Sequence, residues 1–436
     1  MSIWCCIDKD LYQYQSPQSA YLYMARANER DLAAEDLVLT DIRIGGPPPN
    51  SSSNYSWETR AAGIWVLRGI FGDTTGRAVT EVDVLFGPDA VDPRPHWTLL
   101  QDPLELDHQS KVLAGRLSVL RGRAKSRPDS RHALRVREDG TFKIVQISDT
   151  HMVTGVGVCK DAIDAFGKDV PECDADPLTV SLIESVLDAE EPDLVVLTGD
   201  QLHHDISDSQ SALFKVVAPI IKRSIPFAAV FGNHDSEGIH ALSRRTQMSI
   251  LENLPLSFCD SGPDDVDGVG NFCLEILASV PSQQPLLTLY FLDSHGQISG
   301  SAHKPGYDSI SQNQIKWFTD TSQAKRLARE TGENDNEFHI SLAFLHIPLP
   351  EFSDCRLRIH SGQREEPTEG PSLNTHLYDA LVEERPKNSR MVIQPLNEAL
   401  GYAMQVAAGL VVTAHMTAGD LTEECGFGKL IQGVGA

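Results

Sequence analysis

The spacing of apolar residues along the chain changes near residue 142. Before that point, three stretches show partial alternation of apolar and polar residues and are rich in β-branched and aromatic side chains. They are Asp36–Ile44, Gly63–Phe71 and Thr80–Gly87. Such a pattern is typical of β-strands that bury one face. We therefore expect a β-rich N-terminal domain over residues 1–125.

From Phe142 onward, apolar runs alternate with amphipathic segments. The runs expected to form strands are Lys143–Ser148, Asp193–Asp200, Phe227–Asp235, Asn271–Ala278, Leu286–His295 and His339–Pro348. The segments expected to form helices are 177–190, 208–222, 240–253 and 311–328. Repeated strand–helix units predict a largely parallel sheet with helices on its faces. Two adjacent strands from Asn271 indicate an antiparallel portion.

The stretch Arg121–His132 is basic, polar and interrupted by Pro128. A role in nuclear import or nucleic-acid binding is one reading, but the overall charge favours an exposed linker. We therefore divide the chain into the N-terminal domain, a linker over 126–141, a main domain over 142–384 and a divergent segment over 385–436.

The composition is that of an ordinary globular protein, with 436 residues of which 41% are hydrophobic. Lys and Arg total 37 against 61 Asp and Glu, which gives a net charge of −24. So acidic a surface argues against nucleic-acid binding, and a phosphorylated substrate would need a local cation to bind. The apolar run Ala403–Met416 is too short and interrupted to span a bilayer, so we expect no membrane segment.

The start of the chain lacks the basic and apolar pattern of a secretion signal. The eight cysteines show no paired C-x-x-C spacing. We therefore expect mostly reduced thiols in a cytoplasmic protein.

Four of the expected strands end in side chains that can bind metal ions. These side chains are Asp149 and His151, Asp200, Asn233 and His234, and His346. In sheets of this kind ligands gather at the carboxyl ends of the strands, so we expect them to converge. Carboxylate, amide oxygen and imidazole without thiolate suit Mg, Mn, Fe or Zn. Gly199 and Gly232 stand where the backbone must turn sharply at a crowded site.

This ordered set resembles the calcineurin-like metallophosphoesterases. The stretches "FKIVQISDTHM", "DLVVLTGDQLHHDISDSQSALFKVVAPI", "FAAVFGNHDSEG" and "LLTLYFLDSHG" read like a fungal subfamily related to small purple-acid-phosphatase-type enzymes with a DxH first motif. The resemblance extends over residues 37–381, roughly. It implies an α/β fold, a metallophosphoesterase β-sandwich flanked by helices, beside the smaller β-rich domain.

The resemblance also implies a phosphatase that uses two divalent or trivalent metal ions, drawn from Mn, Fe, Zn and Mg, and a hydroxide that bridges them. By this resemblance Asp149 and His151 bind one ion, Asp200 bridges both, and Asn233 and His346 bind the second. His234 is not a ligand but the catalytic residue that faces the substrate. The implied substrate is phosphorylated, either a phosphoprotein or a small phosphoester.

Several further residues are weaker candidates. His203 and His204 could line the substrate side of the site, although a supporting or surface role is as well founded. Asp293 is expected to support the architecture. Arg244, Arg245 and Arg364 could bind phosphate, but solvent exposure is favoured for each.

The chain departs from the family pattern after His346, because no GHxH motif follows. The only histidine in the final stretch is His415, at the end of the strand-like "GLVVTAH". It could replace a missing ligand, but an unrelated apolar segment is the favoured interpretation. One hypothesis is an insertion after Glu384 in a chain that stops before the motif. It predicts that strands of the sheet are left with an uncovered edge or face.

Three functions therefore remain open. The chain could be an active dimetal phosphatase, a phosphatase-fold protein with impaired or no catalysis because it lacks the GHxH ligands, or an interaction protein that acts through its acidic surface. The ligands that remain favour the first two.

Overall fold

The chain forms two compact units, each described here by itself. One comprises Met1–Asp129, Val153–Val156 and Ile206–Ala218, and the other Ser130–Met152, Gly157–Asp205 and Pro219–Ala436. The computed structural model describes residues 3–48, 56–74, 76–106, 112–122, 132–160, 162, 166–170, 173–298, 306–330, 339–356, 368 and 370–384, and the backbone of 391–395, 411–416 and 430–431.

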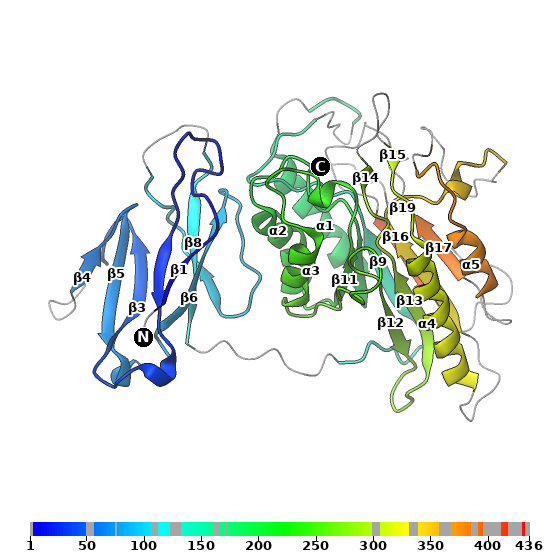
Figure 1. The fold of residues 1–436 in the computed structure, drawn as a ribbon, viewed down its shortest axis with the longest axis horizontal. Helices are drawn as coiled ribbons and strands as arrows, with labels where there is room; N and C mark the ends of the chain where they lie inside the picture. The colour runs from blue at the N-terminus through cyan, green and yellow to red at the C-terminus, as the bar shows by residue number, and fades with distance from the viewer. Residues whose placement is uncertain are drawn as a thin grey trace. The chain divides into compact units, whose positions relative to one another are not determined.

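The first unit contains two three-stranded antiparallel sheets (Figure 1). One consists of β3 (Leu37–Ile44), β5 (Ile64–Ile70) and β4 (Trp57–Thr59), and the other of β6 (Val79–Phe86), β8 (Gly115–Arg121) and β7 (Trp97–Leu99). Their inward side chains form one apolar cluster that includes Ile42, Val66, Val84 and Val119. A separate antiparallel pair joins β1 (Ile3–Cys6) to β2 (Tyr23–Arg26). The predicted β-rich N-terminal region is thus confirmed.

Two short segments from the middle of the chain also belong to the first unit. The N–H of Phe86 donates to Ser211 Oγ at 2.9 Å, and Lys215 Nζ lies 2.8 Å from Asp89 Oδ2. Lys9 Nζ lies 3.5 Å from Asp208 Oδ1. The Lys215 side chain is 3% exposed, so its buried charge requires a partner such as the Asp89 carboxylate. The first unit is therefore not one continuous stretch of sequence.

The second unit is built on two sheets. The first has the order β11 (Phe227–Val230), β10 (Leu194–Thr198), β9 (Phe142–Ile147), β18 (Val411–Met416) and β19 (Leu430–Ile431). The second has the order β12 (Phe272–Leu277), β13 (Pro285–Phe291), β16 (Ile340–Leu345) and β17 (Met391–Pro395). Strands β9, β10 and β11 are parallel, whereas β12 and β13 are antiparallel, as the sequence predicted.

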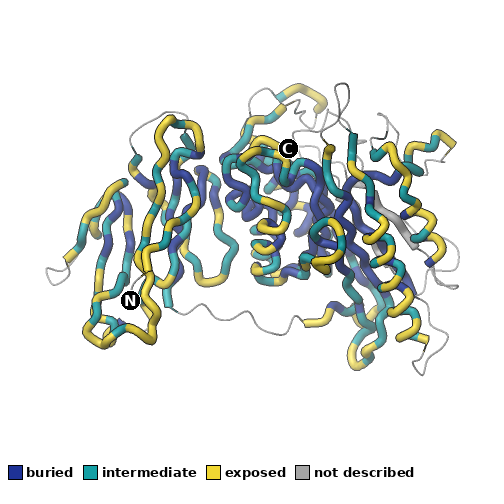
Figure 2. The backbone as a smooth tube through the Cα atoms, viewed as in Figure 1, coloured by how far each residue is buried: buried dark blue, intermediate teal, exposed yellow. Residues whose placement is uncertain are grey.

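The two sheets pack face to face around a shared apolar core. Ile144, Val196 and Val230 from the first sheet belong to the same buried cluster as Leu289 and Phe344 from the second. Figure 2 shows these strands as the most continuously buried part of the unit. Strands β10, β11 and β16 are buried along their whole length, and close packing on both faces holds the backbone rigid up to the point where each strand ends.

Helices lie outside the sheets. They are α1 (Ala175–Glu190), α3 (Arg244–Glu252), α4 (Gln312–Glu330) and α5 (Leu377–Glu383). Helix α2 (Ser209–Lys222) is divided between the units, since its residues up to Ala218 belong to the first. Helices α4 and α5 cover the outer face of the second sheet, where Phe318, Leu377 and Leu381 pack with Tyr290 and Leu345 (Figure 1). This arrangement confirms the predicted α/β sandwich flanked by helices. Among the described residues, no helix combines the length and apolar character needed to cross a bilayer.

Within the described part of the chain, β9 and β16 do not have the uncovered edge that the sequence predicted, and the prediction is wrong for these two strands. Residues after Glu384 supply a neighbour to each sheet, since β17 pairs parallel with β16 and β18 pairs antiparallel with β9. The "VVTAHM" and "MVIQP" stretches are β-branched and apolar enough to serve as strands although they do not resemble the family.

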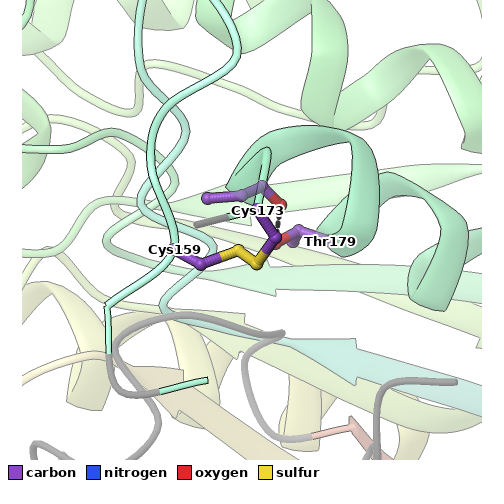
Figure 3. Close-up of a disulfide and its surroundings, with 4 residues drawn as sticks. Cys159, Cys173 and Thr179 are labelled. Atoms are coloured by element: carbon purple, nitrogen blue, oxygen red, sulfur yellow. Dashed lines mark hydrogen bonds between the residues drawn. A yellow bond between two sulfur atoms is a disulfide. The ribbon is translucent and has the colours of Figure 1, made fainter. Parts of the chain in front are cut away.

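A disulfide joins Cys159 to Cys173. Figure 3 shows it beside the start of α1, where Thr179 Oγ1 donates to the carbonyl of Ala175. The N–H of Cys159 also donates to the carbonyl of Cys173 at 2.8 Å. The sequence interpretation missed this pair because its spacing matches no familiar motif. Among the described cysteines, those outside a disulfide are Cys5, Cys6, Cys259, Cys273 and Cys355.

We expect the disulfide to stabilise the second unit by closing the loop before α1. Replacing both Cys159 and Cys173 with Ser should lower the free energy of unfolding by about 2–4 kcal/mol, since the unfolded chain regains the freedom of that loop. Urea unfolding measures this. Reductant should lower the midpoint of the wild type and leave that of the double variant unchanged. Cys355→Ser, at an exposed position, is the control without effect. A wild-type midpoint insensitive to reductant contradicts the prediction.

Candidate metal and active site

The loops that follow β9 and β10 stay paired beyond the ends of the strands. The N–H of Asp149 donates to the carbonyl of Gly199, and the N–H of His151 to that of Asp200, each at 3.0 Å. Asp149, His151 and Asp200 have φ angles of 56°, 43° and 50°. Positive φ is uncommon for residues other than glycine and clusters at functional sites. Backbone pairing thus holds three candidate ligands in conformations that a free loop would avoid.

Two glycines let these loops approach their neighbours closely. A Cβ at Gly199, where φ is 106°, would lie 2.5 Å from His346 Nδ1. A Cβ at Gly232 would lie 2.1 Å from Asp200 Oδ1. Any larger residue would therefore push the side chains of the site apart, which is the physical reason for glycine at both positions.

One buried carboxylate, that of Asp235, ties the loops together. Its Oδ2 accepts from the N–H groups of Asp200 at 2.9 Å and Gly232 at 2.7 Å, and its Oδ1 accepts from the N–H of Leu202 at 2.9 Å. Burial, followed by the nearby Asp200 charge, raises the pKa of Asp235 to about 7. The sequence interpretation missed this residue. Its place as the last residue of "GNHD", beside turns that leave amides unpaired, was the available signal.

Most of the candidate ligands surround the carboxylate of Asp200, which is fully buried. Asp200 Oδ2 lies 3.4 Å from His346 Nε2 and 3.9 Å from the Nε2 atoms of both His151 and His234. Asp149 Oδ1 lies 3.8 Å from His151 Nε2. The structure thus brings together residues from four strand ends that are far apart in the sequence.

The polar atoms of this cluster fit a metal ion. Asp200 Oδ2 and Asn233 Oδ1 are buried and have no hydrogen-bond partner within the described part of the chain. Unpaired buried oxygens are costly unless something else, such as a cation, contacts them. Asp149, His151 and Asp200 each offer a ligand atom, and these atoms lie within 4.8 Å of one another. Carboxylate and imidazole ligands of this kind suit a hard or borderline divalent cation.

Without metal, a proton takes the place of the cation. Burial alone would lower the pKa of His346, but the facing Asp200 carboxylate raises it to about 10. Burial opposes ionisation of Asp200, yet the imidazoles, His346 first, hold its pKa below the usual range. His346 Nδ1 lies 2.9 Å from the carbonyl of Thr198, which directs Nε2 toward Asp200. Burial also raises the pKa of Asp149 and lowers that of His151.

Four imidazoles form a closed group beside Asp200. The ring centroids of His203 and His204 are 4.1 Å apart, and those of His204 and His234 are 5.4 Å apart. His151 lies 5.3 Å from His234 and 6.3 Å from His203. Burial lowers the pKa of His203 to about 4, so this ring is neutral at pH 7. The two weaker candidates therefore lie next to the stronger ones.

Arg244 does not have the exposed position favoured by the sequence. Its side chain is 14% exposed, and it donates to the carbonyls of Gly232 and His295 at 2.6 and 2.8 Å. It also pairs with the buried Asp293 at 2.5 Å. Arg244 therefore fixes the turn before Asn233 and is not available to bind phosphate. Arg245 is 57% exposed, and Arg364 lies outside the described residues.

His415 lies at the wrong end of the sheet to replace a ligand. In the antiparallel pairing of β18 with β9, it stands opposite Lys143, near the start of β9. Asp149 follows the other end of that strand, six residues further along. At about 3.3 Å per residue, this places the two backbone positions roughly 20 Å apart.

The fold and this cluster agree with the comparison to known families. The family model of the calcineurin-like phosphoesterases matches residues 142–378, and the chain belongs to that family. This is more than half of the chain and contains the whole cluster around Asp200.

Individual relatives carry phosphatase names. Phosphatase DCR2 of Saccharomyces cerevisiae is 37% identical over 294 residues, which cover 66% of this chain and 48% of that protein. "Probable inactive purple acid phosphatase 29" of Arabidopsis thaliana is 34% identical over 265 residues, which cover 58% of this chain and 66% of that protein. The chain thus spans about half to two thirds of the length of these relatives. A dimetal phosphatase from Danio rerio shares 13% identity with a TM-score of 0.37, over 64% of this chain and 93% of its own.

We expect metal binding to release a proton. His346 carries a proton below pH 10 in the metal-free protein, whereas a metal-bound imidazole must be neutral. Metal affinity should therefore rise with pH, by about tenfold per pH unit for one displaced proton. Calorimetric titration with Zn²⁺ near pH 7, in two buffers of different ionisation enthalpy, measures the number released. His346→Gln is the matched variant, since it should bind metal more weakly and release less. Equal heats in both buffers contradict the prediction.

Proposed function

We propose that the chain is a metal-dependent phosphatase that hydrolyses phosphoric esters at a centre formed by Asp149, His151, Asp200, Asn233 and His346. The observation that carries this proposal is the fully buried Asp200 carboxylate. Its Oδ2 has no hydrogen-bond partner among the described residues and has three imidazoles within 4 Å. A buried carboxylate in this position is suited to bind a cation.

The assignment of two ions follows the family resemblance. Asp149 and His151 would hold one ion, Asp200 would bridge, and Asn233 and His346 would hold the other. Bound divalent ions supply a hydroxide at neutral pH and neutralise charge on the phosphoryl oxygens. They would also offset the repulsion between a phosphorylated substrate and a chain whose net charge is −24.

His234 is proposed as the residue that acts on the substrate. Its N–H donates to Asp200 Oδ1 at 2.8 Å, which fixes its backbone beside the metal ligands. Its side chain is 21% exposed, so the ring borders both the ligand cluster and solvent. From there it can give a proton to the leaving oxygen. His203 and His204 complete the wall on the substrate side.

A second candidate is a phosphatase-fold protein that holds a single ion and turns over little. One observation favours it: Asp149, His151 and Asp200 form the single group of three metal-ligand side chains recognised within the described residues. The GHxH histidines of the family pattern are also absent from the sequence.

The substrate and the cellular location remain proposals. A phosphoprotein and a small phosphoester both suit a metal-bound phosphate site. The cytoplasmic location stays a prediction, and the Cys159–Cys173 disulfide weighs against it because disulfides persist mainly in oxidising compartments.

Metal content separates the two candidates. We expect the protein, dialysed against Mn²⁺ or Zn²⁺ and freed of excess metal, to retain two ions per chain by elemental analysis if the centre is dinuclear. One ion per chain supports the second candidate. A protein that retains none, and whose melting temperature does not change at millimolar metal, contradicts both.

Two substitutions should have different effects on metal and turnover. Asp200→Asn removes the charge that the nearby imidazoles share. We therefore expect this variant to lose both its bound metal and its ability to hydrolyse an aryl phosphate. His234→Ala should keep its metal while kcat falls by about 10²–10⁴-fold, since it removes a proton donor and no ligand. Elemental analysis and initial rates on the same samples measure both. Loss of metal in His234→Ala would overturn the role given to His234.

A further inference from the structure

The carboxylate of Glu237 lies against the far nitrogen of His234. Glu237 Oε2 is 2.6 Å from His234 Nδ1, which is a short hydrogen bond between an imidazole and a carboxylate. The two residues are joined by a short 3-10 turn over His234–Ser236, in which the N–H of Glu237 lies 3.3 Å from the carbonyl of His234. The turn therefore fixes where the carboxylate stands.

This contact determines which nitrogen of His234 faces the cluster. The His234 backbone is held by Asp200 Oδ1, and Nδ1 is engaged by Glu237. The remaining nitrogen, Nε2, lies 3.9 Å from Asp200 Oδ2. A carboxylate on one nitrogen of an imidazole fixes both its orientation and its tautomer.

Of the two acids in "GNHDSEG", Glu237 is the one whose carboxylate contacts the His234 ring. The neighbouring acid, Asp235, has both oxygens occupied by backbone amides. An ordinary surface pair of the same spacing occurs elsewhere, between His376 Nδ1 and Asp379 Oδ2 at 2.8 Å, and its side chains are 72% and 60% exposed. The side chains of His234 and Glu237 are 21% and 38% exposed, and the histidine borders Asp200.

We propose that Glu237 is the positioning residue for His234, holding the proton on Nδ1 so that Nε2 is directed at the leaving oxygen of the substrate. This rests on the proposed phosphatase function. In the step, a water oxygen bonds to phosphorus and the bond from phosphorus to the leaving oxygen breaks. That oxygen keeps the electron pair and takes the proton from Nε2 of the protonated ring. The phosphate retains one water proton, and the other returns to His234 through solvent, while Nδ1–H stays bonded to Glu237 throughout.

The kinetic test compares Glu237→Ala and Glu237→Gln with the wild type on two esters. We expect Glu237→Ala to lower kcat about 10–100-fold on an alkyl phosphate, with little change in KM. The loss should be smaller on an aryl phosphate with an acidic phenol, which needs less help from a proton donor. Glu237→Gln should recover part of the loss, because its amide oxygen can accept from Nδ1–H. Equal losses on both esters, or no difference between Gln and Ala, overturn the proposal.

A second comparison removes the effect of misfolding. In a His234→Ala background, Glu237→Ala should cause no further loss, and an additive loss overturns the proposal. Asp379→Ala disrupts the exposed His376 pair and should change neither kcat nor melting temperature.

A spectroscopic test of the contact requires no turnover. In the metal-free protein labelled with ¹⁵N-histidine, a downfield Nδ1–H resonance should vanish in both Glu237→Ala and His234→Ala but persist in Asp379→Ala. A resonance that survives Glu237→Ala overturns the positioning role. A wild type that shows this resonance but hydrolyses neither ester contradicts the phosphatase proposal instead, so the two failures are distinguishable.

Discussion

Three backbone amides share one buried carboxylate, that of Asp235, and the geometry of the site depends on this interaction. The amides of Asp200, Leu202 and Gly232 would otherwise be left unpaired where two strand-end loops meet away from water. In a dry environment a satisfied carboxylate holds its donors firmly, whereas an unsatisfied one is costly. Asp235 thereby allows the loops after β10 and β11 to touch at the distances that the two glycines permit.

Asp200 is buried in the same dry environment, and the hydrogen bond from the N–H of His234 to its Oδ1 offsets the cost of its charge only in part. Among the described residues, its side-chain partners are imidazoles, which can hold or lose a proton at modest cost, and not guanidinium or ammonium groups. A protonated His346 balances the carboxylate in the metal-free protein, and a cation can take over that role. Arg244 is one permanent positive charge close by, and it is committed to Asp293 and two carbonyls. Either protons on the imidazoles or a metal ion can therefore balance the negative charge of Asp200.

The parts of this structure that the sequence predicted are those with a local pattern. Strands β3, β5 and β6 fall within the predicted stretches or one residue beyond them, and the α/β sandwich follows from the alternation after Phe142. The strand ends of "SDTH", "TGD", "GNHD" and "FLHIP" predicted which side chains would meet. Parallel strands β9, β10 and β11 deliver the first three to one edge of the first sheet, whereas β16, which precedes His346, belongs to the second sheet. The rest depends on partners distant in sequence. Nothing near Arg244 indicates that residues 293 and 295 will surround it, and nothing near Cys159 identifies Cys173 as its partner. "GLVVTAH" was recognised as strand-like, but the places of β17 and β18 in the two sheets were missed, because a family comparison decided the interpretation of the residues after Glu384.

The pairing of β18 with β9 affects how the protein folds while it is being synthesised. The paired residues stand about 270 positions apart, so β9 is synthesised long before its neighbour on one side exists. At about 5–20 residues per second, translation alone separates the two strands by on the order of 15–50 s. Strands β10 and β11 can join β9 early, but its other edge, apolar and lined with unpaired amides, stays open for that whole interval. An apolar strand edge that stays open is prone to pair with other chains, so the rate of translation sets how long the nascent protein is exposed to aggregation.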